Sequence, residues 1–318
     1  MRKAINRERV EGRVYEHSLV LKTVQNTSSE NYGKEFIAGN IDVATDDEGL
    51  NIVTVHFSYV TPTFGSTGKP NDTFTALKNI IETGKTVLTD GFDVATMVRI
   101  DTALDVNDFY TNRNGEETLV TAKRNEGGFC HIISKLEKDE SKRNTFEVDM
   151  LINGTKYVEA DEEKKIANDY IVVKGCVFNF RNAVLPVELI CKDPNGIKYF
   201  ESLDASPSNL TFTKVWGKIN SETIIDKREE ESAFGEPSIK EYTRTIKEWV
   251  IIGAAPEAYE MENAETGITS EEIKAGIEAR NVYLADVKKR NDEYQASKNS
   301  AKPAAAASAP AAAGGFSF

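Results

Sequence analysis

The 318-residue sequence is poor in the side chains that hold metal ions or disulfides. It has three cysteines and three histidines, and no pair of cysteines has the CxxC spacing of a structural zinc site. An odd cysteine count argues against a disulfide framework and is typical of a reducing compartment. We therefore expect no metal ion, no cofactor and a cytoplasmic location.

Long apolar stretches are also absent. The longest runs, such as 249–252, contain four residues, whereas a membrane-spanning helix needs about 20. Residues 1–8 carry charge, and no apolar stretch follows them. We therefore expect neither a secretory signal nor a membrane as partner.

The sequence also lacks an excess of positively charged residues. Aspartate and glutamate total 51 against 39 lysines and arginines, which gives a net charge of −12. A strongly basic chain would favour nucleic acid as a partner, and this chain is acidic. Because binding depends on where the charges lie, the acidic total does not exclude a local basic groove.

Catalytic motifs are missing as well. The sequence has no GxSxG, P-loop, HExxH or strand-linked GxGxxG pattern. Cys130 and His131 are adjacent, and neighbours on a strand point to opposite faces, which favours packing over a catalytic dyad. The acidic runs 46–48 and 229–231 match no calcium loop and are interpreted as solvated turns. We therefore expect that the protein is not an enzyme.

What is present, first, is a strand-rich region at 8–135. Alternating apolar residues predict three strands, then a helix, then two more strands. The strands are 10–24, 36–43, 50–60, 96–106 and 119–123, and the helix is 74–82. This is the order of an OB fold, a five-stranded Greek-key barrel.

A second region at 144–254 has a similar outline. Strands are predicted at 145–152, 170–181, 183–191, 210–219 and 242–253. Residues 193–196 are predicted as a turn, and no helix is evident between the third and fourth strands. The acidic segment 226–237 is predicted as a mobile loop. The expected fold class is therefore mainly β, with two OB-like five-stranded Greek-key barrels.

A helix is predicted at 269–297, because Thr269 and Glu272 form a capping-box pattern. Its apolar stripe consists of Ile273, Ile277, Leu284, Val287 and Tyr294. We expect this stripe to dock on the chain's own domains, with a partner helix as the alternative. The remaining residues, 298–318, are rich in Ala, Pro, Ser and Gly and are predicted to form a flexible tail.

Aromatic and basic residues alternate on several predicted strands, a pattern that suits base stacking beside phosphate contacts. Residues 212–218 carry the clearest alternation, and Lys247 and Trp249 share a face of the last strand. The alternative is that Trp216 and Tyr15 are core residues and that the lysines only snorkel. The full set of predicted nucleic-acid contacts is Arg13, Tyr15, Arg99, Tyr110, Lys123, Phe212, Lys214, Trp216, Lys218, Lys247 and Trp249.

Three segments carry a resemblance to a known family. The stretch 39–46, the hairpin strand 53–60, and the segment 98–115 with its Asn-Gly turn are similar to those of phage-type single-stranded DNA-binding proteins. The resemblance covers the first 135 residues well and the second region weakly. It implies an OB fold, sequence-independent binding of single-stranded DNA, and work in DNA replication, recombination or repair in the host cytoplasm.

The resemblance also concerns the tail. Proteins of this kind end in a flexible arm that recruits replication or recombination proteins and often finishes in phenylalanine, and this chain ends with Phe316 and Phe318. An inert spacer is the alternative for the tail. For the whole chain, the rival hypothesis is a structural or assembly protein, such as a virion component, that binds no nucleic acid. The oligomeric state is left open.

Overall fold

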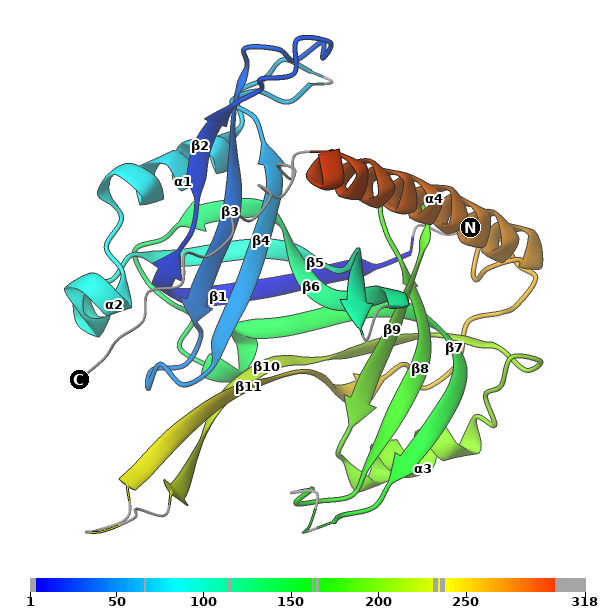
Figure 1. Cartoon of the computed structure of the whole chain (residues 1–318). Helices are drawn as coiled ribbons and strands as arrows, with labels where there is room; N and C mark the ends of the chain where they lie inside the picture. The colour runs from blue at the N-terminus through cyan, green and yellow to red at the C-terminus, as the bar shows by residue number, and fades with distance from the viewer. Residues whose placement is uncertain are drawn as a thin grey trace, which may run out of the picture.

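The computed structural model describes residues 4–65, 67–113, 116–161, 163, 166–230, 234 and 238–300. Within these residues, eleven strands join into one sheet that is flanked by helices (Figure 1). The prediction of a mainly β chain is confirmed. The pairings form two closed circuits, which we call the first ring and the second ring.

The first ring consists of β1 (Asn6–His17), β3 (Glu35–Ala44), β4 (Ile52–Val60), β5 (Met97–Arg113) and β6 (Glu116–Ile132). Strand β1 pairs antiparallel with β3 and with β5, β3 pairs with β4, and β5 pairs with β6. A short parallel pairing between β4 and β6 closes the circuit. Apolar side chains that alternate along these strands, among them Val10, Ile41 and Phe57, are fully buried inside.

The predicted strand 10–24 is two strands. After β1 ends, the short strand β2 (Val20–Thr23) pairs with the first half of β3, along the same edge whose second half pairs with β1. The chain turns at Ser18, whose backbone N–H donates to the Asn40 carbonyl over 2.9 Å. Gly39 makes this close approach possible: its φ is +135°, and a Cβ there would lie 2.3 Å from the Ser18 carbonyl oxygen.

Helix α1 (Asp72–Thr83) lies between β4 and β5 in the chain and is followed by the short helices α2 (Val87–Asp90) and η1 (Phe92–Val94). It begins where the Asn71 side chain accepts a hydrogen bond from the Thr73 backbone N–H over 3.1 Å, a typical helix N-cap. Leu77 and Ile80 are buried in the core. The predicted helix 74–82 is thereby confirmed.

The second ring repeats the same order. Its strands are β7 (Asn144–Val158), β8 (Tyr170–Phe178), β9 (Val184–Cys191), β10 (Thr211–Glu230) and β11 (Ser238–Ala254), and η2 (Glu140–Lys142) precedes them. Strand β7 pairs with β8 and β10, β8 pairs with β9, and β10 pairs with β11. A parallel pairing between β9 and β11 closes this circuit as well.

The turn predicted at 193–196 is wrong, because helix α3 (Pro194–Ser202) begins there. The Asp193 carboxylate accepts hydrogen bonds from the backbone N–H groups of Asn195 and Gly196, each over 2.9 Å. Pro194 stands at the first helical position, where its missing N–H costs nothing. The same residue types that favour a turn therefore also cap a helix, and α3 lies between the third and fourth strands of its ring, as α1 does.

The two rings are joined through β1 and β7, which pair antiparallel from Asn6–Val148 to Val10–Asn144. Each ring also sends a long hairpin to the other (Figure 1). Hairpin β5–β6 reaches β9, where the Lys123 ammonium donates to the Glu188 carbonyl over 2.5 Å. Hairpin β10–β11 reaches the first ring, where the Ser221 backbone N–H donates to the Asn51 side chain over 2.7 Å.

These hairpins are longer than predicted. Strand β5 continues to Arg113 and β6 runs from Glu116 to Ile132, where 96–106 and 119–123 were predicted. Strand β10 runs to Glu230 and β11 begins at Ser238, so most of the predicted loop 226–237 that the structure describes is strand. In the extension of β5, polar residues such as Asn107 and Asp108 interrupt the apolar alternation in the sequence, although Asp108 is buried in the structure. The division into domains at 8–135 and 144–254 stays a prediction.

Helix α4 (Ser270–Ser300) packs on the chain itself. The predicted capping box is present: the Glu272 backbone N–H donates to the Thr269 hydroxyl over 3.2 Å, and the Thr269 N–H donates to the Glu272 carboxylate over 3.0 Å. Ile273 and Val287 are buried, as expected for docking on the chain's own domains, whereas Ile277 and Tyr294 of the predicted stripe are exposed.

An ion pair fixes α4 to the first ring's hairpin. The Arg280 guanidinium donates to the Asp108 carboxylate of β5 over 2.8 Å, and the Asp108 side chain is completely buried. Of the predicted tail 298–318, residues 298–300 belong to α4, and residues 301–318 lie outside the described residues. Among the helices that the structure describes, none is both long and apolar enough to span a membrane.

Candidate nucleic-acid interface

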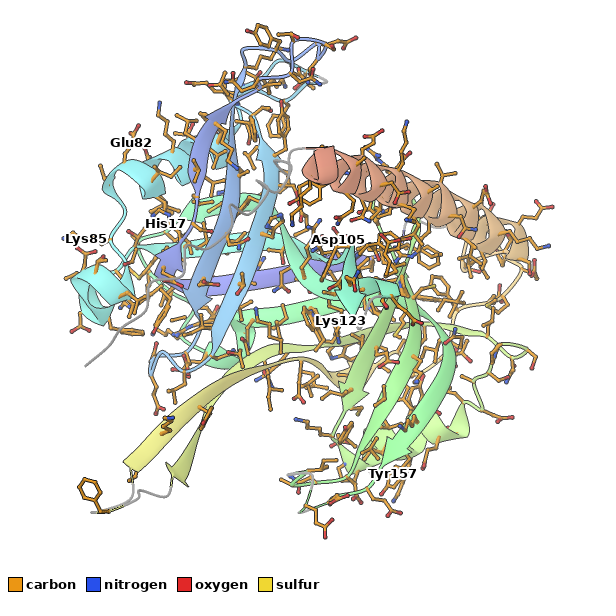
Figure 2. All side chains as sticks on the ribbon, in the orientation of Figure 1. His17, Glu82, Lys85, Asp105, Lys123 and Tyr157 are labelled. Atoms are coloured by element: carbon orange, nitrogen blue, oxygen red, sulfur yellow. The ribbon has the colours of Figure 1, made fainter. Side chains whose placement is uncertain are left out.

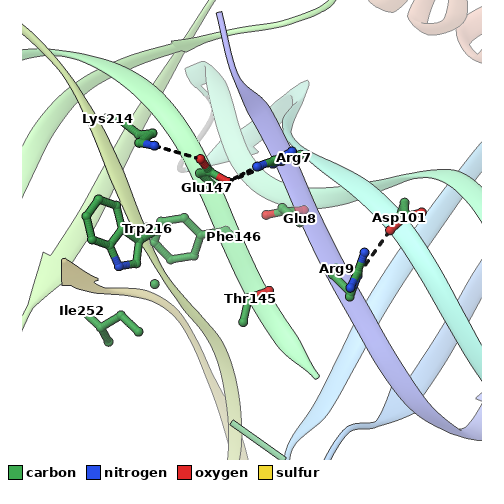
Figure 3. Close-up of a pocket in the computed structure, with 11 residues that line it drawn as sticks. Arg7, Glu8, Arg9, Asp101, Thr145, Phe146, Glu147, Lys214, Trp216 and Ile252 are labelled. Carbon is green, nitrogen blue, oxygen red and sulfur yellow. Dashed lines mark hydrogen bonds and ion pairs between the residues drawn. The ribbon is translucent and has the colours of Figure 1, made fainter. Parts of the chain in front are cut away.

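A groove of about 800 Å³ lies on the outer face of the β1–β7 junction. Because side chains alternate along β1, Arg7 and Arg9 point outward into the groove while the side chains of Glu8 and Val10 are buried. Strands β5, β7, β10 and β11 complete the lining (Figure 3). The lining residues are Arg7, Glu8, Arg9, Asp101, Thr145, Phe146, Glu147, Lys214, Trp216, Gly217 and Ile252.

Three cations and two carboxylates face this groove. The Glu147 carboxylate accepts from Nε of Arg7 over 2.9 Å and from a terminal nitrogen of the same guanidinium. Its other oxygen lies 3.2 Å from the Lys214 ammonium. On the opposite side, Arg9 lies 3.5 Å from the Asp101 carboxylate. The Arg7 and Arg9 side chains are 70% and 53% exposed, so both are accessible to solvent although each is paired with a carboxylate.

Trp216 is the exposed aromatic residue of the groove, whereas Phe146, which also lines it, is buried. Trp216 is 37% exposed, and the Lys214 ammonium lies 5.8 Å from its ring centroid. In the β10–β11 pairing Trp216 stands opposite Gly253, where a Cβ would lie 2.5 Å from an indole atom. Only glycine therefore lets the indole lie this close to β11. The neighbouring Ile252 is exposed and adds apolar surface beside the indole.

The strand register extends the same outer face beyond the groove. Arg99 stands opposite Glu11 in the β1–β5 pairing, next to the pair of Arg9 and Asp101. Lys218 stands opposite Thr145 in the β7–β10 pairing. Of the predicted contacts, Arg99, Lys214, Trp216 and Lys218 therefore lie on one face.

Two predicted contacts are wrong, because their rings are buried. Phe212 has no exposed surface and packs 5.2 Å from the Tyr259 ring and 6.0 Å from the Phe178 ring. Trp249 is 3% exposed, and its indole N–H donates to the Glu8 carboxylate over 2.7 Å. Both residues do lie on strands, as predicted from the alternation. However, the segment after β11 covers the Phe212 ring, and the first ring covers the Trp249 indole.

Two predicted lysines lie at the contact between the rings. The Lys123 ammonium is 4.9 Å from the Trp249 ring, and Figure 2 shows the residue on the hairpin close to β9. Burial lowers the pKa of Lys123. The Lys247 ammonium donates to the Thr54 hydroxyl of β4 over 3.2 Å. Both lysines connect the two rings and lie outside the groove.

The other predicted contacts are scattered. The Arg13 guanidinium donates to the Asp93 carbonyl over 3.3 Å and stacks 5.0 Å from the Phe92 ring, so it holds the η1 segment. Tyr15 is half-buried near the end of β1. Tyr110 lies under α4, where the Lys288 ammonium is 5.2 Å from its ring. The tail residues Phe316 and Phe318 lie outside the described residues.

The sequence reasoning missed Arg7 and Arg9, because it began the first strand at residue 10. The alternation of charge from Arg7 to Val10 was the available signal. It also missed a second aromatic surface, formed by Phe36 and Tyr59, whose ring centroids are 4.6 Å apart. Tyr59 is 46% exposed, so this pair is a further open aromatic surface on the first ring.

Glu8 is the titratable group directly beneath the groove. Its carboxylate is buried between the rings and accepts from the Trp249 indole and from the Thr102 hydroxyl, the latter over 2.9 Å. Burial raises the pKa of Glu8 to about 7, although these two hydrogen bonds act in the opposite direction. Within the described part of the chain, no group of three or more His, Cys, Asp or Glu side chains could hold a metal ion.

A family model described as YorF matches residues 5–290 of the chain. Among solved structures, the wild-type single-stranded DNA-binding protein from Thermus aquaticus is similar, with 7% identity, a TM-score of 0.46, and coverage of 82% of this chain and 97% of that one. A deletion mutant of the same protein has 8% identity, a TM-score of 0.45, and coverage of 83% and 99%. No curated protein matches the chain. At this identity and TM-score, the likeness by itself establishes neither the fold nor the function of this chain.

Proposed function

The chain belongs to the YorF family, and we propose that it binds single-stranded DNA without sequence preference through the groove at the β1–β7 junction. The observation that carries this proposal is the partly exposed Trp216 indole, with Lys214, Arg7 and Arg9 around it. Single strands bind to surfaces of this kind because bases stack on the ring while cations follow the phosphates. Each stacked base contributes about 1–3 kcal/mol whatever its identity.

The strand order supports the proposal. In each ring the first strand pairs with the second and fourth, and the third pairs parallel with the fifth. A helix stands between the third and fourth strands in both cases. We propose that both rings are OB barrels, a class whose surfaces take oligonucleotides. The proposed role is one of binding and not of catalysis.

The wider setting is part of the same proposal. A sequence-independent binder of this kind would protect single strands during replication, recombination or repair in the cytoplasm, that of the host if the protein comes from a phage. The tail 301–318, with Phe316 and Phe318 at its end, would recruit other proteins of that machinery. The acidic total of the chain suits a protein that must not hold duplex DNA without discrimination.

The test is a fluorescence titration with oligo-dT. We expect quenching of tryptophan emission on binding, loss of most of that quenching in Trp216→Phe, and little competition from unlabelled duplex DNA. We also expect affinity to fall with salt, by a slope of about 0.7 for each phosphate contact. Absence of binding at low salt would favour the rival, a structural or assembly protein.

A further inference from the structure

The Glu147 carboxylate occupies the most basic point of the groove. Both its contacts with Arg7 come from one guanidinium, and the Lys214 ammonium approaches its second oxygen (Figure 3). Two N–H groups of one guanidinium therefore converge on one carboxylate oxygen, and the ammonium lies beside the other oxygen. Arginine and lysine bind phosphate oxygens with the same groups.

Glu147 is charged and fixed in this position. Its pKa lies below the usual value, because the bonds from Arg7 and Lys214 outweigh the opposing effect of burial. The strand register also holds it there: on β7 it stands opposite Arg7 on one side and opposite Trp216 on the other. The carboxylate is therefore held by its own backbone between the cations and the indole.

We propose that Glu147 takes the place of a phosphodiester group in the empty groove and must be displaced when a single strand binds. This inference rests on the proposed function and deepens it, because it gives the groove a built-in competitor. An anion that brings only its charge gains little free energy of binding when it displaces a carboxylate that belongs to the protein. A single strand also stacks a base on Trp216, and this added free energy favours displacement of the carboxylate.

Most substitutions in a binding groove weaken binding, whereas loss of the Glu147 charge should strengthen it. Glu147→Gln keeps the shape and the hydrogen-bond acceptor but removes the competing charge. We expect it to bind oligo-dT about tenfold more tightly at low salt, and to increase the salt slope by about 1.4, or 0.7 for each of the two cations released.

Glu188→Gln is the matched control. Glu188 lies on β9 outside the groove and pairs with the Lys174 ammonium over 3.3 Å. Both substitutions remove one negative charge from one ion-paired carboxylate on a strand, so they change the net charge equally. Thermal melting of both variants shows that they are folded, and Glu147→Ala provides a second variant if Glu147→Gln melts early.

A double-mutant cycle with Arg7→Gln sharpens the test. If Glu147 shields Arg7, the loss of Arg7 should weaken oligo-dT binding more in the Glu147→Gln background than in the wild type. Equal effects in both backgrounds would contradict displacement, because the carboxylate would then not compete for the same cation.

The closing experiment titrates wild type, Glu147→Gln and Glu188→Gln with oligo-dT and, separately, with inorganic tripolyphosphate. The inference is supported if only Glu147→Gln gains affinity for both probes. It is overturned if the two variants behave alike. If the wild type fails to bind oligo-dT while Glu147→Gln alone gains tripolyphosphate, the carboxylate is a phosphate substitute and the proposed function is wrong.

Discussion

The two rings have one strand order, yet they contribute different chemistry to the groove. The first ring supplies the cations Arg7 and Arg9, and the second supplies the indole of Trp216 together with Lys214 and its competitor Glu147. Neither ring alone has both a stacking surface and a full set of cations at this place. The candidate site therefore belongs to the junction, and the β1–β7 pairing creates it.

The long hairpins differ as well. Hairpin β5–β6 is held by α4 through the buried pair of Asp108 and Arg280, whereas β10–β11 rests on the turn that contains Asn51 through backbone and amide hydrogen bonds. One hairpin is therefore fixed by a buried ion pair with a helix, and the other by hydrogen bonds, which include the one from the Lys247 ammonium to Thr54. The first prediction tests this difference.

The largest expected effect is on stability. Arg280→Ala leaves the Asp108 carboxylate buried without its cation, and losing one partner of a buried ion pair costs about 3–5 kcal/mol. The free energy of unfolding, measured in urea, should fall by that order. Lys288→Ala is the control on the same helix: its pairs are exposed, and such pairs contribute about 0.2–1 kcal/mol. Similar losses in both variants would contradict the proposed anchoring.

The next effect concerns the contact between the rings. The pKa of Glu8 is about 7 in the folded state against an ordinary value of 4.5. The folded state therefore binds the extra proton between these values, so the stability that Glu8 contributes is complete below about 4.5 and is lost as pH rises through about 7. A shift of this size corresponds to roughly 3 kcal/mol over the window.

The measurement for Glu8 is the urea midpoint from pH 4.5 to 8 in the wild type and in Glu8→Gln. We expect the neutral amide to remove most of the fall in stability across this range. Other groups titrate in both proteins, so the difference between the two curves isolates Glu8. Parallel curves would show that the carboxyl does not titrate in this window.

A smaller effect, on binding alone, tests the second ring's contribution. Trp216→Ala should lose about 1–3 kcal/mol of binding to oligo-dT, the contribution of one stacked base, with an unchanged melting temperature. Phe180→Ala is the matched control, because Phe180 is 87% exposed and lies outside the groove. An equal loss from Phe180→Ala would place the stacking surface elsewhere.

The smallest effect tests the first ring's contribution. Arg9→Gln should lower the salt slope of oligo-dT binding by about 0.7, the value of one phosphate contact. Lys174→Gln removes the same charge from β8, where it pairs with Glu188, and should leave the slope unchanged. If Lys174→Gln has the larger effect, the strand follows the β8–β9 face and avoids the junction.

Much of the fold could be predicted from local patterns. The order of three strands, a helix and two strands in the first ring follows from apolar periodicity, and the start of α4 follows from the capping pair of Thr269 and Glu272. Helix α3 was missed, because Asp193 and Pro194 are typical both of turns and of helix starts. The length of hairpin β5–β6 was missed because polar residues interrupt the apolar alternation there, and Asp108 is buried only through its pair with Arg280 of α4.

The two tryptophans of the chain show which properties are local and which depend on the whole fold. The sequence alone predicts that Trp216 and Trp249 each lie on a strand beside lysines, since period-2 alternation is a local property. Only the packing of the two rings decided that Trp216 is partly exposed in a groove while Trp249 is buried against Glu8. Trp249 is covered by a residue more than 100 positions away in the sequence, Glu8, and no local pattern carries that information.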